Sequence, residues 1–538
     1  MEQLATLKEV LESTVGRHAD SIAFQMRGES GFRKFSFKDV ADIVNSLSIR
    51  LAQAGIKKGD RVALFSENRP EWPLAYLAVT TMGAVVVPID AVLHKNEVKV
   101  LMDDCEAAAI IVSRDCSQNV AGKSIKHVIP VESMSDRVAD EQDLPDVASD
   151  DLAAIVYTSG TTGVPKGVML THGNIASNVE AVAGLFDIGP GDNFLSVLPL
   201  HHTFETTAGF LGPFFLGATI TYAESLKSYS LIQNMQETGT TIMCGVPLLY
   251  QLFYDGIIRE VESKGVAART LFQTLMTLAK NIPSQSIRRK MFGMLHKKFG
   301  GKLRFWVSGG AAIKPETIKG FEIFGIPIMQ GYGLSESSPI LTCCNLENNR
   351  VGSVGRPIPR VEIQIEDGEI VARGPNIMKG YYKRKDLTEE VLKNGWLRTG
   401  DMGSFDGDGF LYITGRCKDV IVTASGVNVY PEEIEKYLSK VPEIKECCVL
   451  GVSVKVGIRA GSEEVMAVVV PDYEYFEKKH KKIGQQEVEE IIRERISDIN
   501  DQIADYKRVA AIKFRSIELP KTRLKKIKKF EVRKEMGL

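Results

Sequence analysis

The feature that most constrains the fold is a loop rich in hydroxyl groups and glycine between two apolar segments. Residues 157–167 read Tyr-Thr-Ser-Gly-Thr-Thr-Gly-Val-Pro-Lys-Gly. Before them, residues 153–156 are apolar and end in β-branched types, which is typical of a buried strand. After them, residues 171–186 have apolar side chains at helical spacing, with Thr171 in the position of an N-cap. The pattern predicts a strand, a loop and a helix in that order.

The composition of this loop favours binding of phosphate oxygens. Its glycines let the backbone turn N–H groups inward, and its hydroxyl groups add further donors. A P-loop would need Gly-Lys-Ser/Thr after four intervening residues, but counting from Gly160 puts Pro165 at the second glycine, so that class is excluded. A solvated linker is the other alternative, and linkers seldom lie between two strongly apolar elements.

Composition bounds the rest of the molecule. A chain of 538 residues exceeds one compact core, which predicts two or more domains. A net charge of −1 gives no field that would recruit nucleic acid. Residues 1–9 lack the apolar segment of a signal peptide, which favours the cytoplasm. The apolar window 208–223 is interrupted by Pro213, so we expect a core or pocket wall rather than a membrane span. The eight cysteines show no zinc or disulfide spacing and are expected to be reduced.

The order of the segments predicts an α/β protein. Helix-like residues 37–54 are followed by apolar runs at 61–65 and 84–89, as in α/β layers. Short β-rich segments between 353 and 412 predict a small barrel or curled sheet. The last 120 or so residues can form a separate α/β domain. We divide the chain into residues 1–417 and 418–538.

The loop and residues 168–172 resemble the signature of the adenylate-forming superfamily, which includes acyl-CoA synthetases, luciferases and nonribosomal adenylation domains. Further motifs follow in the family's order, so the resemblance covers roughly residues 14 to 533. The chain looks most like AMP-forming long-chain fatty acyl-CoA synthetases. This resemblance implies a large N-terminal domain of α/β layers with a small distorted β-barrel, and a smaller, mobile C-terminal α/β domain.

Residues 330–336 resemble the second signature of that superfamily. There Tyr332 would stack on adenine, Ser335 would meet the α-phosphate, and Glu336 would hold Mg²⁺ together with Thr158. Taken alone, Glu336 could equally be a surface or capping acid. The nucleotide and CoA contacts that the resemblance implies are Thr158, Ser159, Gly160, Thr161, Thr162, Gly163, Lys166, Gly310, Gln330, Gly331, Tyr332, Ser335, Asp401, Arg416, Lys418 and Gly426.

Three later motifs complete the resemblance. Residues 398–401 match the ribose motif, in which Asp401 accepts from both ribose hydroxyls, and Lys418 aligns with the hinge between the domains. Near the end, Lys526 aligns with the lysine that bridges the acyl carboxylate and the phosphates. Lys525 stands where the family commonly has glycine, so Lys525 or Lys528 could share that role. Eight lysines and arginines between 521 and 534 could instead be a solvated tail or an anionic-lipid contact.

The resemblance implies two half-reactions. A carboxylic acid and ATP give acyl-adenylate and pyrophosphate, and the thiol of CoA then displaces AMP, with Gly426 leaving room for a thiol tunnel. The catalytic residues would be Lys526, Glu336, Lys166 and His202. His202 would border the acyl carboxylate, and its alternative is a core histidine with a satisfied ring.

Several alternatives stay open from the sequence. The acid could be a medium- or long-chain fatty acid, or an aromatic carboxylate, and the acceptor could be a carrier protein instead of CoA. A luciferase-like oxygenase would share the same motifs, and a non-catalytic nucleotide sensor would retain the fold. The oligomeric state, monomer or homodimer, is also open, and peripheral contact with the inner membrane face through the basic C-terminal segment is a further option.

Overall fold

The structure is a computed structural model that describes residues 4–120, 125–134, 143–159, 165–422, 428–453, 463–479, 483–522 and 527–538. The chain folds into two compact units. The larger comprises Met1–Ile363 and Ala372–Leu397, and the smaller comprises Gln364–Val371 and Arg398–Leu538. The division at residues 417 and 418 stays a prediction, and each unit is described by itself.

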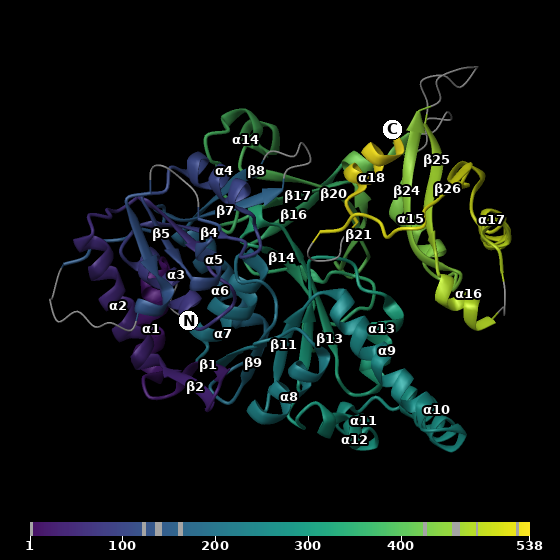
Figure 1. Cartoon of the computed structure of the whole chain (residues 1–538), viewed down its shortest axis with the longest axis horizontal. Helices are drawn as coiled ribbons and strands as arrows, with labels where there is room; N and C mark the ends of the chain where they lie inside the picture. The colour runs from purple at the N-terminus through teal and green to yellow at the C-terminus, as the bar shows by residue number, and fades with distance from the viewer. Residues whose placement is uncertain are drawn as a thin grey trace. The chain divides into compact units, whose positions relative to one another are not determined.

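A seven-stranded, mostly parallel sheet forms one layer of the larger unit (Figure 1). Its strands, in spatial order, are β18 (Gly380–Tyr381), β8 (Pro165–Thr171), β7 (Leu152–Ser159), β4 (Val85–Ile89), β3 (Arg61–Phe65), β5 (Ala109–Val112) and β6 (His127–Pro130). The apolar runs at 61–65 and 84–89, which favoured α/β layers, form β3 and β4.

A nine-stranded sheet forms the second layer of this unit. Its strands, in spatial order, are β15 (Arg356–Pro357), β14 (Ile340–Cys343), β13 (Ile328–Gly333), β12 (Phe305–Ser308), β11 (Ile242–Gly245), β9 (Asn193–Ser196), β10 (Thr219–Tyr222), β1 (Ile22–Gly28) and β2 (Gly31–Ser36). From β13 to β1 all neighbours are parallel, so the carboxyl ends of these strands share one edge.

Helices cover both faces of each sheet, which gives alternating α and β layers. One core joins the two sheets around the helices α1 (Leu7–His18), α2 (Phe37–Gln53), α3 (Glu71–Thr81), α6 (His172–Leu185) and α7 (Gly212–Phe215). A second core packs against the outer face of the nine-stranded sheet through α8 (Ser228–Thr238), α9 (Pro247–Ser263), α10 (Val266–Lys280), α11 (Gln285–Met291), α12 (Gly293–Lys298) and α13 (Pro315–Ile323). The outer face of the seven-stranded sheet carries α4 (Lys95–Cys105) and α5 (Arg114–Ser117).

The remaining strands come after residue 361, and the first of them form a further sheet. A five-stranded sheet occupies the segment for which a barrel or curled sheet was predicted: β16 (Glu362–Glu366), β17 (Glu369–Arg373), β20 (Trp396–Phe405) and β19 (Leu392–Lys393), with β21 (Leu411–Arg416) on β20. The helix α14 (Lys385–Val391) precedes β19, and η4 (Cys417–Asp419), β22 (Ile421–Val422) and β23 (Asn428–Val429) follow β21.

The smaller unit has a hydrophobic core of its own. Its sheet contains β24 (Ile444–Ser453), β25 (Glu463–Pro471) and β26 (Ala511–Phe514). One face packs with α15 (Pro431–Leu438), α16 (Tyr473–Lys479) and α17 (Gln485–Asn500), and the other with α18 (Lys529–Met536). The prediction of a small α/β domain at the end of the chain is confirmed.

The structure corrects the prediction for the hydroxyl-rich loop. Residues 157–167 are not one loop between a strand and a helix, because β7 runs to Ser159 and β8 begins at Pro165. The two strands are antiparallel, so the motif is a hairpin. The helix begins later, at His172, with the Thr171 hydroxyl accepting from the backbone N–H of Asn174, as predicted for an N-cap. The sequence missed β8 because its alternation is short and its residues were attributed to the loop.

Two other predictions concern the core. The segment 208–223 is buried in the larger unit, partly in the π-helix η2 (Glu205–Leu211), and is a core wall as predicted. Within the described ranges, no helix is both long enough and apolar enough to cross a bilayer. All eight cysteines are free, as expected, and seven of them are buried.

Candidate active site

A tyrosine joins the two charged residues predicted for phosphate and metal binding. Tyr381 on β18 pairs with Val168 of β8, two residues beyond Lys166. The side chains of Lys166 and Tyr381 therefore lie on the same face of the sheet. The Tyr381 hydroxyl donates to Glu336 Oε1 at 2.8 Å, and the Lys166 ammonium lies 5.2 Å from the Tyr381 ring centroid. Burial, and then the Glu336 carboxylate, raise the pKa of Tyr381, so it stays a donor.

Thr158 belongs to the same arrangement. It is the direct cross-strand partner of Lys166 in the hairpin, which puts both side chains on one face. Glu336 lies in the short 3-10 helix η3 (Ser335–Ser337), and its carbonyl accepts from the N–H of Met378 at 2.9 Å. The structure thus connects Thr158, Lys166 and Glu336 through β8 and Tyr381.

The Glu336 carboxylate fits a magnesium ligand. It is partly exposed, Tyr381 orients one oxygen, and Oε2 has no partner among the described residues. Hard carboxylate oxygen is the donor that Mg²⁺ prefers, and this ion usually takes only one or two protein carboxylates beside phosphates and water. Within the described ranges, no group of three or more His, Cys, Asp or Glu side chains could hold a metal ion.

The segment that carries His202 contacts the segment that carries Ser335. The hydroxyls of Thr203 and Ser335 are 3.5 Å apart, and Thr207 donates to the Ser338 carbonyl at 3.2 Å. The Phe204 ring packs on Gly309, where an added Cβ would come within 3.0 Å of it. These residues follow the carboxyl ends of β9, β12 and β13, which are parallel strands of one sheet, and this is the edge at which open α/β sheets bind ligands.

His202 differs from a core histidine whose ring nitrogens are both hydrogen-bonded, which was the alternative to a role in acid binding. Its Nε2 is buried, and no described residue bonds to it. Burial lowers the pKa of His202 to about 4, so the ring is neutral at neutral pH. The ring lies beside that of His201, with 4.1 Å between the centroids. A neutral ring can donate or accept a hydrogen bond but supplies no charge to a bound acid.

The other predicted residues of the larger unit lie at the same strand ends. Gly310 follows β12 with φ of +78°, a conformation that favours glycine. Gly331 and Tyr332 are in β13, paired with Cys343 and Thr342 of β14. The buried Gln330 side chain instead donates to the Ser353 carbonyl at 2.7 Å. Its amide therefore supports the strand end rather than pointing to a ligand.

Two predicted residues meet in the smaller unit. Asp401 and Arg416 are cross-strand partners on β20 and β21, and Arg416 Nε lies 2.8 Å from Asp401 Oδ1. Asp401 is buried, and its N–H donates to the Thr399 hydroxyl at 3.1 Å. Lys418 lies in η4, directly after β21. The structure thus brings the predicted ribose and hinge motifs together.

Several predicted residues lie outside the described residues. These are Gly160, Thr161, Thr162, Gly163, Gly426 and Lys526, and the side chains of Ser159 and Lys418 are also outside them. Their roles stay predictions.

Three lysines in the described part of the basic C-terminal segment, Lys521, Lys528 and Lys529, are paired with acids. Lys521 binds Glu446, and Lys529 lies 3.1 Å from Glu435 and 3.3 Å from Glu432. The Lys529 side chain is mostly buried. These lysines hold the smaller unit together and are not a free positive surface.

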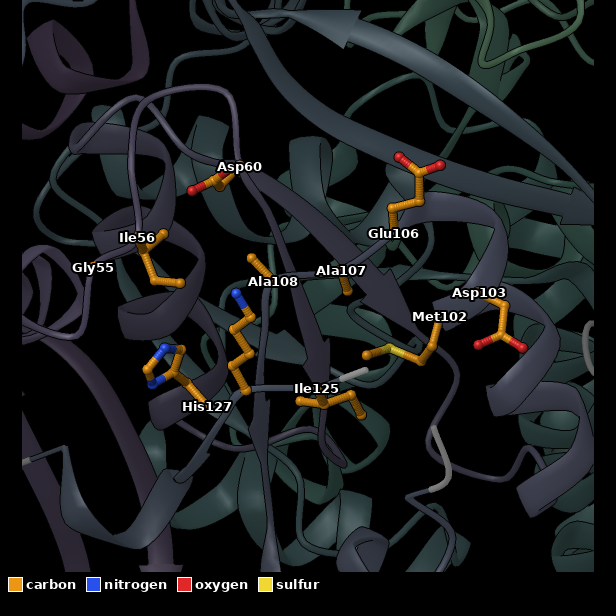
Figure 2. A pocket seen from close by; sticks show the side chains of 11 residues that line it. Gly55, Ile56, Asp60, Met102, Asp103, Glu106, Ala107, Ala108, Ile125 and His127 are labelled. Carbon is orange, nitrogen blue, oxygen red and sulfur yellow. The ribbon is translucent and has the colours of Figure 1, made fainter. Parts of the chain in front are cut away.

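A pocket elsewhere in the larger unit is not this site. It has a volume of about 580 Å³ and is lined by Asp60, Glu106, Ala108 and His127, among others (Figure 2). These residues precede or begin β3, β5 and β6, so the pocket lies at the amino ends of parallel strands. None of the predicted site residues lines it.

Comparison with known proteins identifies the family. The profile of the AMP-binding enzyme family matches residues 11–382, and that of the AMP-binding enzyme C-terminal domain matches residues 433–526. The chain belongs to the AMP-binding enzyme family. The resemblance to adenylate-forming enzymes is therefore confirmed.

Three named relatives are similar to most of this AMP-binding enzyme. The peroxisomal long chain acyl-CoA synthetase 7 of Arabidopsis thaliana is 29% identical over 84% of this chain and 72% of its own. The long-chain-fatty-acid–CoA ligase of Escherichia coli O157:H7 is 28% identical over 99% and 95%. A feruloyl-CoA synthase of Amycolatopsis sp is 28% identical over 94% and 95%.

Solved structures confirm the fold. A fatty acyl CoA synthetase of Mycobacterium tuberculosis superposes with a TM-score of 0.71 at 24% identity, covering 99% of both chains. The ATP-bound MatB of Rhodopseudomonas palustris gives 0.80 at 24% identity, covering 99% of this chain and 98% of that one. The predicted α/β fold with a large N-terminal and a smaller C-terminal domain is therefore confirmed.

Sequence reasoning missed two residues of this arrangement. Tyr381 lies in Gly-Tyr-Tyr, far along the chain from the loop, and only the pairing of β18 with β8 brings it to Lys166. Thr203 directly follows His202, the residue of this segment for which a role was predicted. The signal available for Tyr381 was a polar aromatic residue in a strand too short to be recognised.

Proposed function

We propose that this enzyme activates a medium- to long-chain fatty acid with ATP and transfers the acyl group to CoA. The acid's carboxylate oxygen attacks the α-phosphorus of ATP, and pyrophosphate leaves. The thiol sulfur of CoA then attacks the acyl carbon, and AMP leaves with the electrons of the broken C–O bond. The products are pyrophosphate, AMP and acyl-CoA.

The observation that carries this proposal is the contact of Lys166 and Glu336 with one tyrosine, beside the hairpin loop. The first step brings an anion to a polyanion, so fixed positive charge and positioning should dominate catalysis. Lys166 would neutralise phosphate charge, and Tyr381 would hold the Glu336 carboxylate in place. Mg²⁺ held by Glu336 and Thr158 would supply further charge neutralisation.

The remaining roles follow from position and chemistry. Tyr332 and Gly310 would border adenine, Ser335 the α-phosphate and Asp401 the ribose. His202, neutral at pH 7, would orient the acyl carboxylate by a hydrogen bond rather than by charge. Lys526 would bridge that carboxylate and the phosphates during adenylation. Lys418 would be the hinge of the smaller domain, and the segment of Gly426 would admit the thiol of CoA.

The test is pyrophosphate release from ATP and Mg²⁺ with acids from acetate to palmitate, each with and without CoA. We expect release to peak with a long acid, because each buried CH₂ contributes about 0.8 kcal/mol, and turnover to require CoA. Release without turnover on CoA would indicate a carrier-protein acceptor. No release with any acid would contradict the proposal and favour a nucleotide sensor.

An aromatic acid is the second candidate substrate. The similarity to a feruloyl-CoA synthase, which extends over 94% of this chain, supports including ferulate and benzoate in the same panel. A higher kcat/KM with ferulate than with any fatty acid would favour this candidate.

The cellular setting is a separate proposal. We place the enzyme in the cytoplasm, as a monomer or a homodimer. Sedimentation velocity would determine the oligomeric state, and fractionation of cells would test the location.

A further inference from the structure

One stretch of the larger unit carries only positive charge. Residues 263–304 contain no aspartate or glutamate. They include the basic residues Lys264, Arg269, Lys280, Arg288, Arg289, Lys290, Lys297, Lys298, Lys302 and Arg304. The whole chain has a net charge of −1, so this excess is local.

Much of this charge is exposed and has no carboxylate partner. Acids outside the stretch pair with Lys264, Arg288, Lys298 and Arg304. In the part of the chain that the structure describes, no acid pairs with the exposed side chains of Arg269, Lys280, Lys290, Lys297 and Lys302. Such a surface is complementary to an anionic one.

The same helices expose large apolar side chains. The inner face of α10 packs on the core through residues such as Phe272 and Leu275. Leu271 and Leu278 are seven residues apart, so they share another face of the helix, where they are 62% and 57% exposed. Met294 on α12 is 85% exposed. The three helices α10, α11 and α12 lie at the same corner of the unit (Figure 1).

We propose that α10, α11 and α12 form a surface, here named the basic apolar face, that docks on an anionic lipid membrane. Leu271, Leu278 and Met294 would enter the boundary of headgroups and acyl chains, while Lys280 and Lys290 contact lipid phosphates. Apolar exposure alone would fit many partners, but the absence of acidic residues from the stretch selects a negatively charged one. The paired lysines of the C-terminal segment fit this role less well.

The basic apolar face carries none of the residues proposed for ATP, acid or CoA. Membrane docking can therefore fail while the proposed reaction holds, and the reverse is also possible. Pyrophosphate release in the absence of vesicles measures the proposed reaction, and binding to vesicles measures the proposed docking.

The experiment is co-sedimentation of the full chain with two kinds of vesicle, phosphatidylcholine alone and phosphatidylcholine with an equal amount of phosphatidylglycerol. We expect binding to the anionic vesicles only. Lys280→Gln with Lys290→Gln should weaken it roughly 25-fold, since each basic residue near such a surface contributes about fivefold. Leu271→Ser with Leu278→Ser should weaken it about tenfold or more.

The control removes the same charge elsewhere, by Lys528→Gln with Lys534→Gln, and should leave vesicle binding unchanged. Loss of binding in this control but not in the α10–α12 variants would move the contact to the C-terminal segment and overturn the proposal. No binding by the unmodified chain, or equal binding to neutral vesicles, would also overturn it. So would a lipid-free dimer that Leu271→Ser with Leu278→Ser abolishes, because a second copy would then cover the face.

Discussion

At the scale of single residues, Glu205 is a carboxyl group inside the core. It is fully buried, Ser196 donates to its Oε1 at 2.6 Å, and no described residue bonds Oε2. Burial raises the pKa of Glu205 to about 8, from an ordinary value of 4.5. Between these values the folded state holds a proton that the unfolded state has lost. The free energy of unfolding therefore falls as the pH rises from about 4.5 to about 8.

Glu205→Gln should remove this part of the pH dependence, because glutamine has nearly the same shape and no charge. We expect a flatter plot of Tm against pH across that interval, and a variant up to about 5 kcal/mol more stable than the natural chain above it. Thermal unfolding at several pH values measures both. Glu474→Gln, an exposed residue of α16, controls for the loss of one carboxylate. An unchanged slope in Glu205→Gln would contradict the assignment.

Tyr381 offers a test of the phosphate and metal arrangement. Tyr381→Phe removes the hydrogen bond to Glu336 but keeps the ring beneath Lys166. Because hydrogen bonds to charged groups contribute about 1.5–3 kcal/mol, we expect the Mg²⁺ concentration for half-maximal pyrophosphate release to rise about tenfold. Tyr382→Phe changes the neighbouring residue in the same way and should not alter the Mg²⁺ dependence. If pyrophosphate release depended on Mg²⁺ concentration in the same way in both variants, the Tyr381 hydroxyl would have no role in metal binding.

Lys526 is tested against its neighbours. Lys526→Ala should slow adenylate formation about 100-fold or more, as loss of a group that stabilises transition-state charge does, while ATP still binds. Lys525→Ala and Lys528→Ala should have small effects. Pyrophosphate release gives the rates and calorimetry gives the ATP affinity. If Lys526→Ala formed the adenylate at the full rate while Lys525→Ala or Lys528→Ala lost activity, the bridging role would belong to that neighbouring lysine.

At the scale of elements, the β7–β8 hairpin depends on close packing at Gly167. An added Cβ there would lie 2.8 Å from Ile155 Cγ2 and 3.3 Å from Tyr382 Cβ. Gly167→Ala should therefore lower the free energy of unfolding by about 1–3 kcal/mol. Gly184→Ala in α6, where nothing lies within 4 Å, should be neutral or stabilising by up to about 1 kcal/mol. Denaturant unfolding of both variants measures their free energies of unfolding. A similar loss of stability in the two variants would contradict the packing argument.

Elements with a strong period could be predicted from the sequence, and short ones could not. The cap at Thr171 and the apolar face of α17, with Val488, Ile492 and Ile496 buried, follow from local patterns. Two-residue strands such as β18 have no period to recognise, and their existence depends on a partner distant in the chain. For the same reason the motifs pointed to Lys166 and Glu336, whereas Tyr381 between them needed the sheet.

At the scale of the whole molecule, the smaller unit contains a core that does not draw on the larger one. Apolar residues of β24, β25 and α17 pack together, including Val449, Val469 and Ile492. We expect a fragment of residues 418–538 to unfold cooperatively when heated, as seen by circular dichroism. A fragment of residues 1–417 should bind ATP in calorimetry but release no pyrophosphate, because it lacks Lys526. A broad, non-cooperative transition of the shorter fragment would contradict the predicted domain boundary.

The pairing of β8 with β18 also bears on how the enzyme is made. A ribosome completes the hairpin loop and Lys166 long before it reaches Tyr381, so a nascent chain carries the loop without the strand that flanks it. Glu336 is likewise made before the phenol that orients it. The growing polypeptide therefore cannot form the contact of Lys166 and Glu336 with one tyrosine until Tyr381 has been made.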